Sequence, residues 1–308
     1  MTIIVTKSRH VSVTHGAEES ERETGEMTSP RPPHPAMRFG FVVPWGDAAD
    51  VGELAATAEH HGWDGLFVWE SLWGVDAWVS LAVAACRTST LRLGTMLTPL
   101  PRRKPWELAG QVATVDRLSA GRVTLAVGLG APDTGYANFG EVIDRRTRAE
   151  LLDEGLAVLR GLWHGQPFTH DGTHYQITPC DFPTIGHTAQ PGGVPIWCVG
   201  ALHSTRSMNR AFGCDGLLPQ VVEAGVARQC TLDELRALEV PSRPTLPPRD
   251  ERGDRPYDIV VEGSVSEHSP AAWADAGATW WIESMWSAIG DTDPVGAALE
   301  RLRRGPPL

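Results

Sequence analysis

The feature that most constrains the fold of this chain is a regular alternation of short apolar segments with amphipathic ones, which runs from Met37 to the end. The short segments are rich in aliphatic, β-branched and aromatic residues, as expected of strands buried on both faces of a parallel sheet. The predicted strands are residues 39–43, 65–69, 91–95, 123–127, 195–200, 215–219, 258–263 and 279–285.

Amphipathic helices are predicted between most of these strands. The first has Asp50 as its N-cap and Gly62 just beyond its end, and the third opens with Pro105 in its first turn and ends at Gly121. Others are expected to begin at Asp76, to cover 145–163 and 204–212, and to cover 294–304 near the end of the chain. A small hairpin is expected around Asp171 and Gly172, after the long helix.

Eight strand–helix units favour a closed ring, since open doubly wound sheets usually stop at five to seven strands. The sequence therefore predicts an α/β protein with the architecture of a (β/α)8 TIM barrel and an insertion after strand four, at about residues 131–194. A doubly wound sheet is the alternative.

The first 36 residues differ from the rest of the chain. They are rich in charge and proline, with the stretches EESERETGE and SPRPPHP, and they lack sustained periodicity. Such a segment buries too little apolar surface to offset the entropy of ordering. We expect residues 1–36 to form a disordered N-terminal tail, or to reflect a misread start upstream of Met37, and residues 37–308 to form the barrel domain.

Charge and composition restrict the partners and the compartment. A formal net charge of −11 without a basic stripe disfavours nucleic acid. Five cysteines, an odd number without a CxxC pair, favour reduced thiols and a cytoplasmic location. No apolar run approaches the roughly 20 residues that cross a bilayer, and no signal peptide is evident, so neither a membrane partner nor secretion is expected.

No metal site is predicted. The pairs His60–His61 and His170–His174 lack the carboxylates and the helical spacing of a zinc site. Metal-dependent barrel hydrolases usually begin with His-x-His on the first strand, and residues 39–43 contain no histidine. A barrel hydrolase is thus the least favoured alternative.

Several stretches, in order, resemble the luciferase-like flavin-dependent oxidoreductases, a family that includes the bacterial luciferase-like monooxygenases. They are RFGFVVPWG, HHGWDGLFVWES, RLGTMLTPLPRRKPWELAGQVATVDRLSAGRVTLAVGLG, RAELLDEGLAVLRGLWHGQPFTHDGTHYQI, PIWCVG and DAGATWWIES. The resemblance spans Met37 to Leu308. It implies a barrel that binds FMN or the deazaflavin coenzyme F-420 (F420) at the carboxyl ends of its strands, and it implies a homodimer.

The loop after strand four, Gly128-Leu129-Gly130, is a candidate cofactor contact. Two interpretations stay open: glycines that let the backbone approach a flat ring, or a tight turn that needs positive φ. A dinucleotide fingerprint is disfavoured, because Asp133 stands where a third glycine belongs. In FMN-binding luciferases an arginine in this loop reaches the phosphate, and here Leu129 occupies the position, which weighs against that mode of binding.

A second candidate follows strand five, where Gly200 and Ala201 precede the start of a helix. Backbone N–H groups at a helix start, with the hydroxyls of Ser204 and Thr205 and the charge of Arg206, suit a phosphate. The alternative is that a hydroxyl only caps the helix.

Two further candidates lie at other strand ends. The family often has Asp-His after strand two, and the histidine is a proton-transfer candidate. Here the pair is Glu70-Ser71, and a serine does not relay protons as imidazole does, so Glu70 is the remaining catalytic candidate. The alternative is that Glu70 serves as a structural hydrogen-bond acceptor at the strand end. The resemblance also implies a non-prolyl cis peptide behind the ring, at Met96-Leu97 or one residue earlier.

Twelve tryptophans are present, and six fall near strand ends, where they either line an apolar site or pack in the core. These are Trp45, Trp69, Trp73, Trp280, Trp281 and Trp286.

The sequence thus predicts a flavin-dependent oxidoreductase, in the first place a monooxygenase that uses reduced FMN and molecular oxygen on a small organic substrate, with a flavin reductase as a possible supplier of the cofactor. The alternatives are an F420-dependent reductase or dehydrogenase, and a non-catalytic flavin-binding barrel.

Overall fold

A computed structural model describes residues 37–43, 45–165, 167–180, 187–223, 226–241, 256–263, 268–287 and 292–307. The chain divides into two compact units, Met1–Pro33 and His34–Leu308. The first unit, and with it the prediction of a disordered tail at 1–36, lies outside the described residues. Everything below concerns the second unit.

Eight parallel strands pair into a closed ring. Each strand is hydrogen-bonded to the next, and the last returns to the first through the pairing of Gly40 with Ile282. In ring order the strands are β1 (Arg38–Val43), β2 (Gly65–Val68), β3 (Arg92–Thr95), β5 (Val123–Gly128), β8 (Ile196–Ala201), β9 (Gly216–Glu223), β11 (Asp258–Gly263) and β12 (Trp280–Ser284). The (β/α)8 barrel is confirmed, and the doubly wound sheet is excluded.

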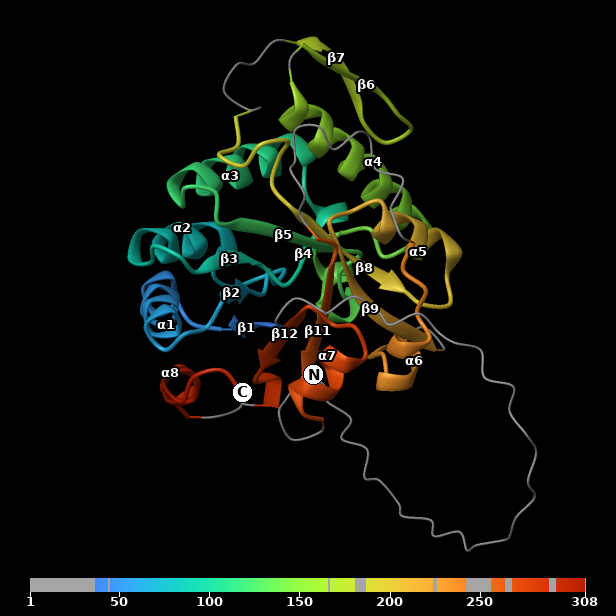
Figure 1. Cartoon of the computed structure of the whole chain (residues 1–308). Helices are drawn as coiled ribbons and strands as arrows, with labels where there is room; N and C mark the ends of the chain where they lie inside the picture. Colours follow the sequence, from blue (N-terminus) through green and yellow to red (C-terminus); the bar gives the residue numbers. More distant parts are fainter. Residues whose placement is uncertain are drawn as a thin grey trace, which may run out of the picture. The chain divides into compact units, whose positions relative to one another are not determined.

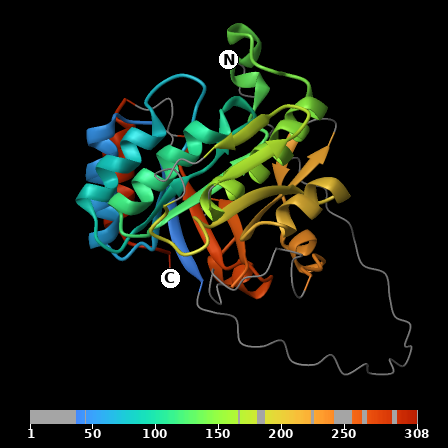
Figure 2. The same cartoon turned by 90° about the horizontal axis from the view of Figure 1, so that it is seen from above.

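Helices follow the strands and lie on the outside of the ring (Figures 1 and 2). They are α1 (Ala48–His60), α2 (Ala77–Arg87), α3 (Pro105–Leu118), α4 (Arg145–His164), α5 (Thr205–Phe212), α6 (Leu232–Arg236), α7 (Pro270–Asp275) and α8 (Pro294–Arg303). After α4, the hairpin of β6 (Phe168–Asp171) and β7 (Gln176–Cys180) extends beyond the helical layer (Figure 1). Together with α4 it forms the insertion predicted after the fourth barrel strand.

The interior of the barrel is filled by aromatic rings. Trp197 and Trp280 have ring centroids 5.3 Å apart, and Phe67 lies 5.3 Å from Trp197 and 5.9 Å from Trp280. Below them Asp258 accepts the indole N–H of Trp197 at 3.1 Å and forms an ion pair with Arg38. Side chains alternate along a strand, so only the carboxyl ends of the strands leave inward-facing positions above this plug.

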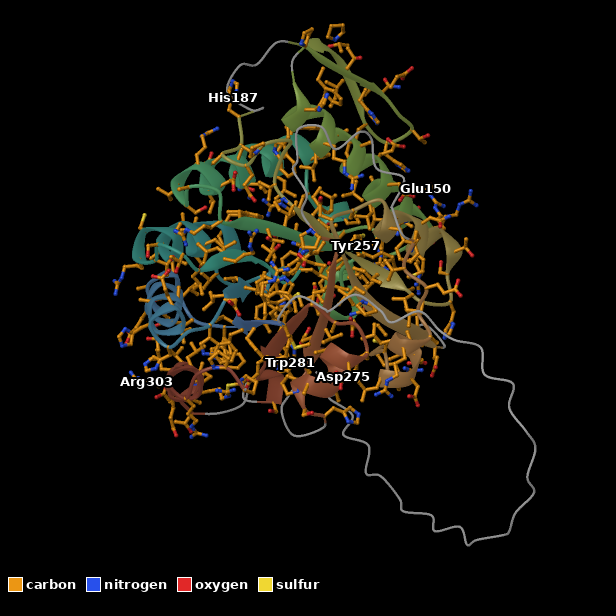
Figure 3. The ribbon with its side chains drawn as sticks, viewed as in Figure 1. Glu150, His187, Tyr257, Asp275, Trp281 and Arg303 are labelled. Atoms are coloured by element: carbon orange, nitrogen blue, oxygen red, sulfur yellow. The ribbon has the colours of Figure 1, made fainter. Side chains whose placement is uncertain are left out.

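Outward-facing residues of the same strands pack against the helices. Trp281, labelled in Figure 3, lies between the inward-facing Trp280 and Ile282 and packs outside the barrel near Trp273 of α7, with ring centroids 6.4 Å apart. Beside it Glu283 points outward and pairs with Arg301 of α8 at 2.6 Å. The alternation is therefore established for β12, the strand that closes the ring.

The N-cap predicted for the first helix is wrong by three residues. Asp47, not Asp50, accepts the N–H groups of Ala49 and Asp50, at 2.7 and 2.9 Å. Asp50 instead sits at the third helical position and accepts the N–H of Asp47 at 2.8 Å, which completes a capping box. At the other end Gly62 follows the C-cap with φ +81°, as predicted.

The DRLSAGR stretch braces the amino-terminal end of β5. The guanidinium of Arg122 donates to the carbonyls of Ala85, Thr88 and Leu91 at 2.7–3.0 Å. Asp116 is fully buried and accepts the N–H groups of Ala189 and Gln190. This stretch, which carries much of the family resemblance, is structural and lies at the opposite end of β5 from Gly128.

Some of the short elements were not predicted from the sequence. Strand β9 runs on to Glu223 and pairs antiparallel with β10 (Val226–Gln229), and α6 follows it. Helix α7, capped by Ser269, has only six residues. Elements this short leave little periodicity in a sequence.

Within the described part of the chain, every helix is too short or too polar to cross a lipid bilayer.

Glu59 ties the end of α1 to the loop before β3. Its carboxylate accepts the N–H groups of Ser89, Thr90 and Leu91 at 2.6–2.9 Å. Burial alone would raise the pKa of Glu59, but these donors outweigh it and hold the pKa at about 2, below the ordinary value of 4.5. The stabilisation is therefore complete above pH 4.5 and is lost as the pH falls towards 2.

We predict that Glu59→Gln lowers the free energy of unfolding by about 1 kcal/mol at pH 7, allowing for solvent screening at this partly exposed site. The deficit should shrink at pH 3, where the wild-type carboxylate begins to protonate. Urea denaturation at both pH values measures it, with Glu53→Gln on the exposed face of the same helix as control. An equal deficit at both pH values would contradict the assignment.

Candidate active site at the carboxyl ends of the barrel strands

Inward-facing side chains at the carboxyl ends of the strands form one ring, which we call the barrel mouth. The apolar core inside the barrel reaches it through Met96, with Leu97, Val199 and Trp286 packed on top. Strand alternation places the others at the same level. The barrel mouth comprises Trp69, Met96, Leu97, Gly128, Val199, Gln220, Glu262, Ser284 and Trp286.

Strand β3 ends in a bulge that contains the expected non-prolyl cis peptide, between Met96 and Leu97. Beyond it β4 (Thr98–Pro99) resumes the pairing with β5, opposite Val127 and Gly128. A Cβ built on Gly128 would lie 3.0 Å from Leu97 and 3.1 Å from Val199. Leu97 and Val199 therefore pack directly over the backbone of Gly128 at the barrel mouth, with little room for a Cβ between them.

Gly130 has a different role from Gly128. It adopts φ +77°, and a Cβ there would lie 2.0 Å from the hydroxyl oxygen of the buried Tyr136. Arg148 of α4 donates to the carbonyls of Leu129 and Gly130, at 3.0 and 3.1 Å. The turn interpretation is therefore confirmed at Gly130, whereas Gly128 lies at the barrel mouth and its contact with a flat ring stays a prediction.

Glu70 is buried within a hydrogen-bonded network behind the end of β3. Its carboxylate accepts from the Thr98 hydroxyl at 2.7 Å and from Arg103 at 3.0 Å. The indole N–H of Trp78 is 3.3 Å away. All three donors belong to the protein, so the structure favours the structural interpretation of Glu70 over a role in which it touches substrate.

At the end of β8, the predicted residues divide between two sides of the strand. A Cβ on Gly200 would lie 2.4 Å from Leu217 and 2.8 Å from Met208, so its open side faces α5 and not the barrel mouth. A glycine is needed at this position for helix packing, and the predicted contact of Gly200 with the cofactor stays a prediction. The backbone N–H of Ala201 donates to Ser207 at 3.0 Å.

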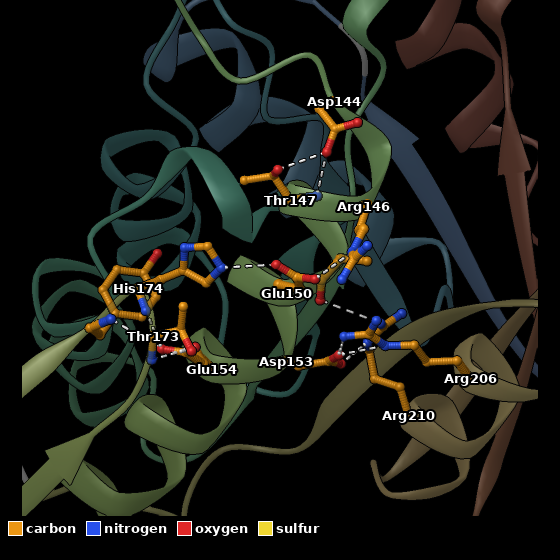
Figure 4. Close-up of polar contacts among 12 residues, drawn as sticks. Asp144, Arg146, Thr147, Glu150, Asp153, Glu154, Thr173, His174, Arg206 and Arg210 are labelled. Atoms are coloured by element: carbon orange, nitrogen blue, oxygen red, sulfur yellow. Dashed lines mark hydrogen bonds and ion pairs between the residues drawn. The ribbon is translucent and has the colours of Figure 1, made fainter.

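Ser204 caps helix α5, as the alternative interpretation holds, by accepting the N–H of Ser207 at 3.4 Å. Arg206 points along the helix to Asp153 of α4, at 2.8 Å, and Arg210 shares the same carboxylate (Figure 4). Burial would raise the pKa of Asp153, but the two arginines outweigh it and lower it. Of the candidates here, Thr205 is exposed at the first helical position.

The tryptophans near strand ends differ in where their side chains lie relative to the barrel. Trp69 and Trp286 meet at the barrel mouth edge to face, with centroids 5.7 Å apart. Trp280 belongs to the interior plug and Trp281 to the outer layer, whereas Trp73 is 63% exposed. Two of these five thus line the candidate site. The sixth, Trp45, follows β1, and its indole nitrogen is buried.

Glu262 was not predicted from the sequence. It follows the inward-facing Val260 by two residues, so its side chain faces the barrel mouth, and it accepts the indole N–H of Trp286. Burial raises the pKa of Glu262, although the hydrogen bonds from Trp286 and Ser284 partly offset the effect. The indicator in the sequence was an acidic residue in phase with the apolar positions of the strand DIVVEG.

Comparison with known proteins agrees with this geometry. Residues 11–301 match the family model described as luciferase-like monooxygenase. The chain belongs to this family. It is accordingly an oxidoreductase of the luciferase-like type.

Individual relatives differ in chemistry. The chain is 30% identical over 281 residues to the F420-dependent glucose-6-phosphate dehydrogenase of Nocardia farcinica (strain IFM 10152), an alignment that covers 79% of this chain and 81% of that protein.

Two solved structures share the fold. An F420-dependent secondary alcohol dehydrogenase in complex with an F420-acetone adduct has a TM-score of 0.68, is 16% identical and covers 88% of this chain and 98% of its own. Monooxygenase RslO1 from Streptomyces bottropensis has a TM-score of 0.60, is 22% identical and covers 87% and 80%.

We predict that Thr98→Val lowers the free energy of unfolding by about 1–3 kcal/mol, because it removes a hydrogen bond to the buried Glu70 carboxylate. Chemical denaturation measures the change. Thr114→Val, on the exposed face of α3, removes a hydroxyl that contacts only its own helix and should change stability by less than about 0.5 kcal/mol. Equal effects for the two variants would exclude a bracing role for the Glu70 network.

Proposed function

We propose that this protein is an oxidoreductase that transfers hydride between a small organic substrate and coenzyme F420, bound across the barrel mouth. Of the functions that the sequence left open, the relatives support this one over an FMN-dependent monooxygenase. The single observation that carries the proposal is the apolar surface of Leu97, Gly128 and Val199 at the barrel mouth, in a chain 30% identical to an F420-dependent dehydrogenase.

The residues present fit a flat, largely apolar ring system. Gly128 offers backbone without a Cβ, and Met96, Leu97 and Val199 supply an apolar floor. The rings of Trp69 and Trp286 stand at the opposite edge of the mouth. Such a surface excludes water and accepts an aromatic face by dispersion and stacking.

For the phosphate, the start of α5 is the proposed contact. The first N–H groups of a helix have no acceptor within the helix and attract anions, and the hydroxyl of Thr205 is exposed there. Arg206 stays a candidate only if it leaves Asp153. Leu129 is directed to the outer core and contributes its carbonyl to Arg148, so its side chain has no part in this proposal.

The chemistry that the deazaflavin supplies is acceptance or donation of a hydride at its ring. The protein's part is to position and to desolvate. The Gly128 backbone and the Leu97 and Val199 side chains would fix the plane of the cofactor ring. A substrate carbon must lie against the other face of that ring. Glu70, through Thr98 and Arg103, braces the strand end that carries this floor, and is therefore a positioning residue.

The other expectations for partners remain proposals. A small organic substrate is consistent with the apolar mouth. Hydride transfer from F420 does not involve a separate flavin reductase, so this partner belongs to the FMN-dependent alternative. Pairing as a homodimer is still a prediction from the family resemblance.

Binding of cofactor tests the proposal. Titration of F420 into the protein should quench tryptophan fluorescence saturably, because Trp69 and Trp286 lie at the site, and FMN should bind more weakly. Gly128→Ala should raise the dissociation constant for F420 about tenfold, which corresponds to roughly 1.4 kcal/mol, since the new methyl group displaces Leu97 or Val199 into the ring position.

Gly110→Ala is the matched control. A Cβ at Gly110, on helix α3, meets nothing within 4 Å, so the same substitution there should leave the dissociation constant unchanged. Tighter binding of FMN than of F420, or equal effects of the two alanines, would contradict the proposal. Binding without turnover of any reductant or alcohol would favour the non-catalytic alternative.

A further inference from the structure

The barrel mouth contains a single carboxyl group among apolar and aromatic side chains. Of its nine members, Glu262 alone is ionisable, and Gln220 and Ser284 are the other polar ones. The carboxyl accepts the indole N–H of Trp286, whose ring packs against the apolar core of the barrel and meets Trp69 edge to face. Glu262 therefore faces the same barrel mouth to which we assign the cofactor ring.

The described charged groups nearby are directed elsewhere. Glu283, the next carboxylate along the barrel wall, faces outward and is paired with Arg301. Glu70 is paired with Arg103 behind β3, and Arg228 on β10 is paired with Glu223 and Glu234. On β9 and β12 the inward-facing groups at this level are the uncharged Gln220 and Ser284. Glu262 thus has no basic partner among the described residues that face the barrel mouth.

We propose that Glu262 is the proton acceptor and donor for the substrate oxygen, and that the substrate is a neutral, apolar secondary alcohol or its ketone. The proposal rests on the F420-dependent function proposed above. During oxidation the carbinol C–H bond breaks and the hydride leaves with its electron pair for the oxidised deazaflavin. The O–H bond breaks at the same time, its proton goes to the Glu262 carboxylate, and the substrate becomes a ketone.

Reduction of the ketone is the reverse, with the Glu262 carboxyl giving its proton to the developing alkoxide. A carboxyl removed from water stays protonated to higher pH than usual, which suits this donor role.

The substrate class follows from the same ring of residues. A sugar phosphate would bring a dianion to a mouth whose described members include no lysine or arginine, and burying an unpaired charge is strongly unfavourable. Trp69, Trp286, Met96 and Val199 instead offer an apolar enclosure. The mouth therefore differs in chemistry from what a phosphorylated sugar needs.

Wild type, Glu262→Gln and Glu262→Asp would be compared for F420 reduction with cyclohexanol and 1-phenylethanol, with glucose 6-phosphate as the charged probe. Exposed Glu53→Gln on α1 is the control. We expect Glu262→Gln to lower kcat roughly 100-fold or more, the usual size of general acid–base catalysis. The dissociation constant for F420, measured by fluorescence, should stay within threefold, and Glu262→Asp should recover part of the rate.

A second readout needs no cofactor. Because Glu262 accepts the indole N–H of Trp286, its protonation should change tryptophan emission. The cofactor-free wild type should show a pH transition above the ordinary carboxyl range that is absent from both Glu262→Gln and Trp286→Phe.

The outcomes separate the two proposals. If wild type reduces F420 and Glu262→Gln does so equally well, or if the transition persists in Glu262→Gln, the role of Glu262 is refuted while the F420-dependent function stands. Turnover of glucose 6-phosphate but not of either alcohol would refute the substrate class. If wild type neither binds nor reduces F420, the proposed function fails and the role of Glu262 fails with it.

Discussion

Closure of eight parallel strands into a ring is the constraint on which the rest of this structure depends. A closed ring sends alternate side chains inward, and the interior of this one is filled by Phe67, Trp197 and Trp280. The amino-terminal end is sealed by the pairing of Arg38 and Asp258 beneath these rings. The remaining inward positions lie at the carboxyl ends, so any ligand of the barrel axis must meet the residues that end the strands.

The site is built in layers, each with its own support. Leu97, Gly128 and Val199 form the floor, and Glu70, Arg148 and Arg103 hold the loops behind it by bonds to side chains and carbonyls. The carboxylate of Glu70 accepts donors from the protein, and Arg148 donates to two loop carbonyls, so these groups give the loops a defined conformation. Glu262 differs from them because the side chains that donate to it in the described part of the chain, Trp286 and Ser284, are both uncharged.

Much of the fold was predictable from the sequence, because the eight barrel strands are apolar and regularly spaced. The long helix Arg145–His164 carries an amphipathic stripe, and the turn at Gly62 is marked by its glycine. The predicted position of the N-cap was wrong because Asp47 and Asp50 are both good N-cap residues, and only the backbone conformation decides which one precedes the helix. Helices α6 and α7 were missed because five or six residues do not reveal a period.

The sequence predicted which residues end the strands, but it did not predict which of them face the barrel mouth. The cis peptide at Met96-Leu97 is confirmed and Gly128 lies at the barrel mouth, whereas Gly200 and Arg206 are engaged by α5 packing and by Asp153. A sequence shows that a glycine follows a strand, but not which face of the strand its open side takes. Glu262 was overlooked because its position at the barrel mouth is evident only once Val260, two residues earlier on β11, is known to face inward.

The central claim is that a deazaflavin ring lies on the floor made by Leu97, Gly128 and Val199, with Glu262 and Trp286 beside it. A crystal structure of the complex with F420 tests it most directly. The account predicts density for the ring against the Gly128 backbone and a carboxyl oxygen of Glu262 open to the substrate side. Density for the ring on the helical layer, or at the amino-terminal end of the barrel, would contradict it.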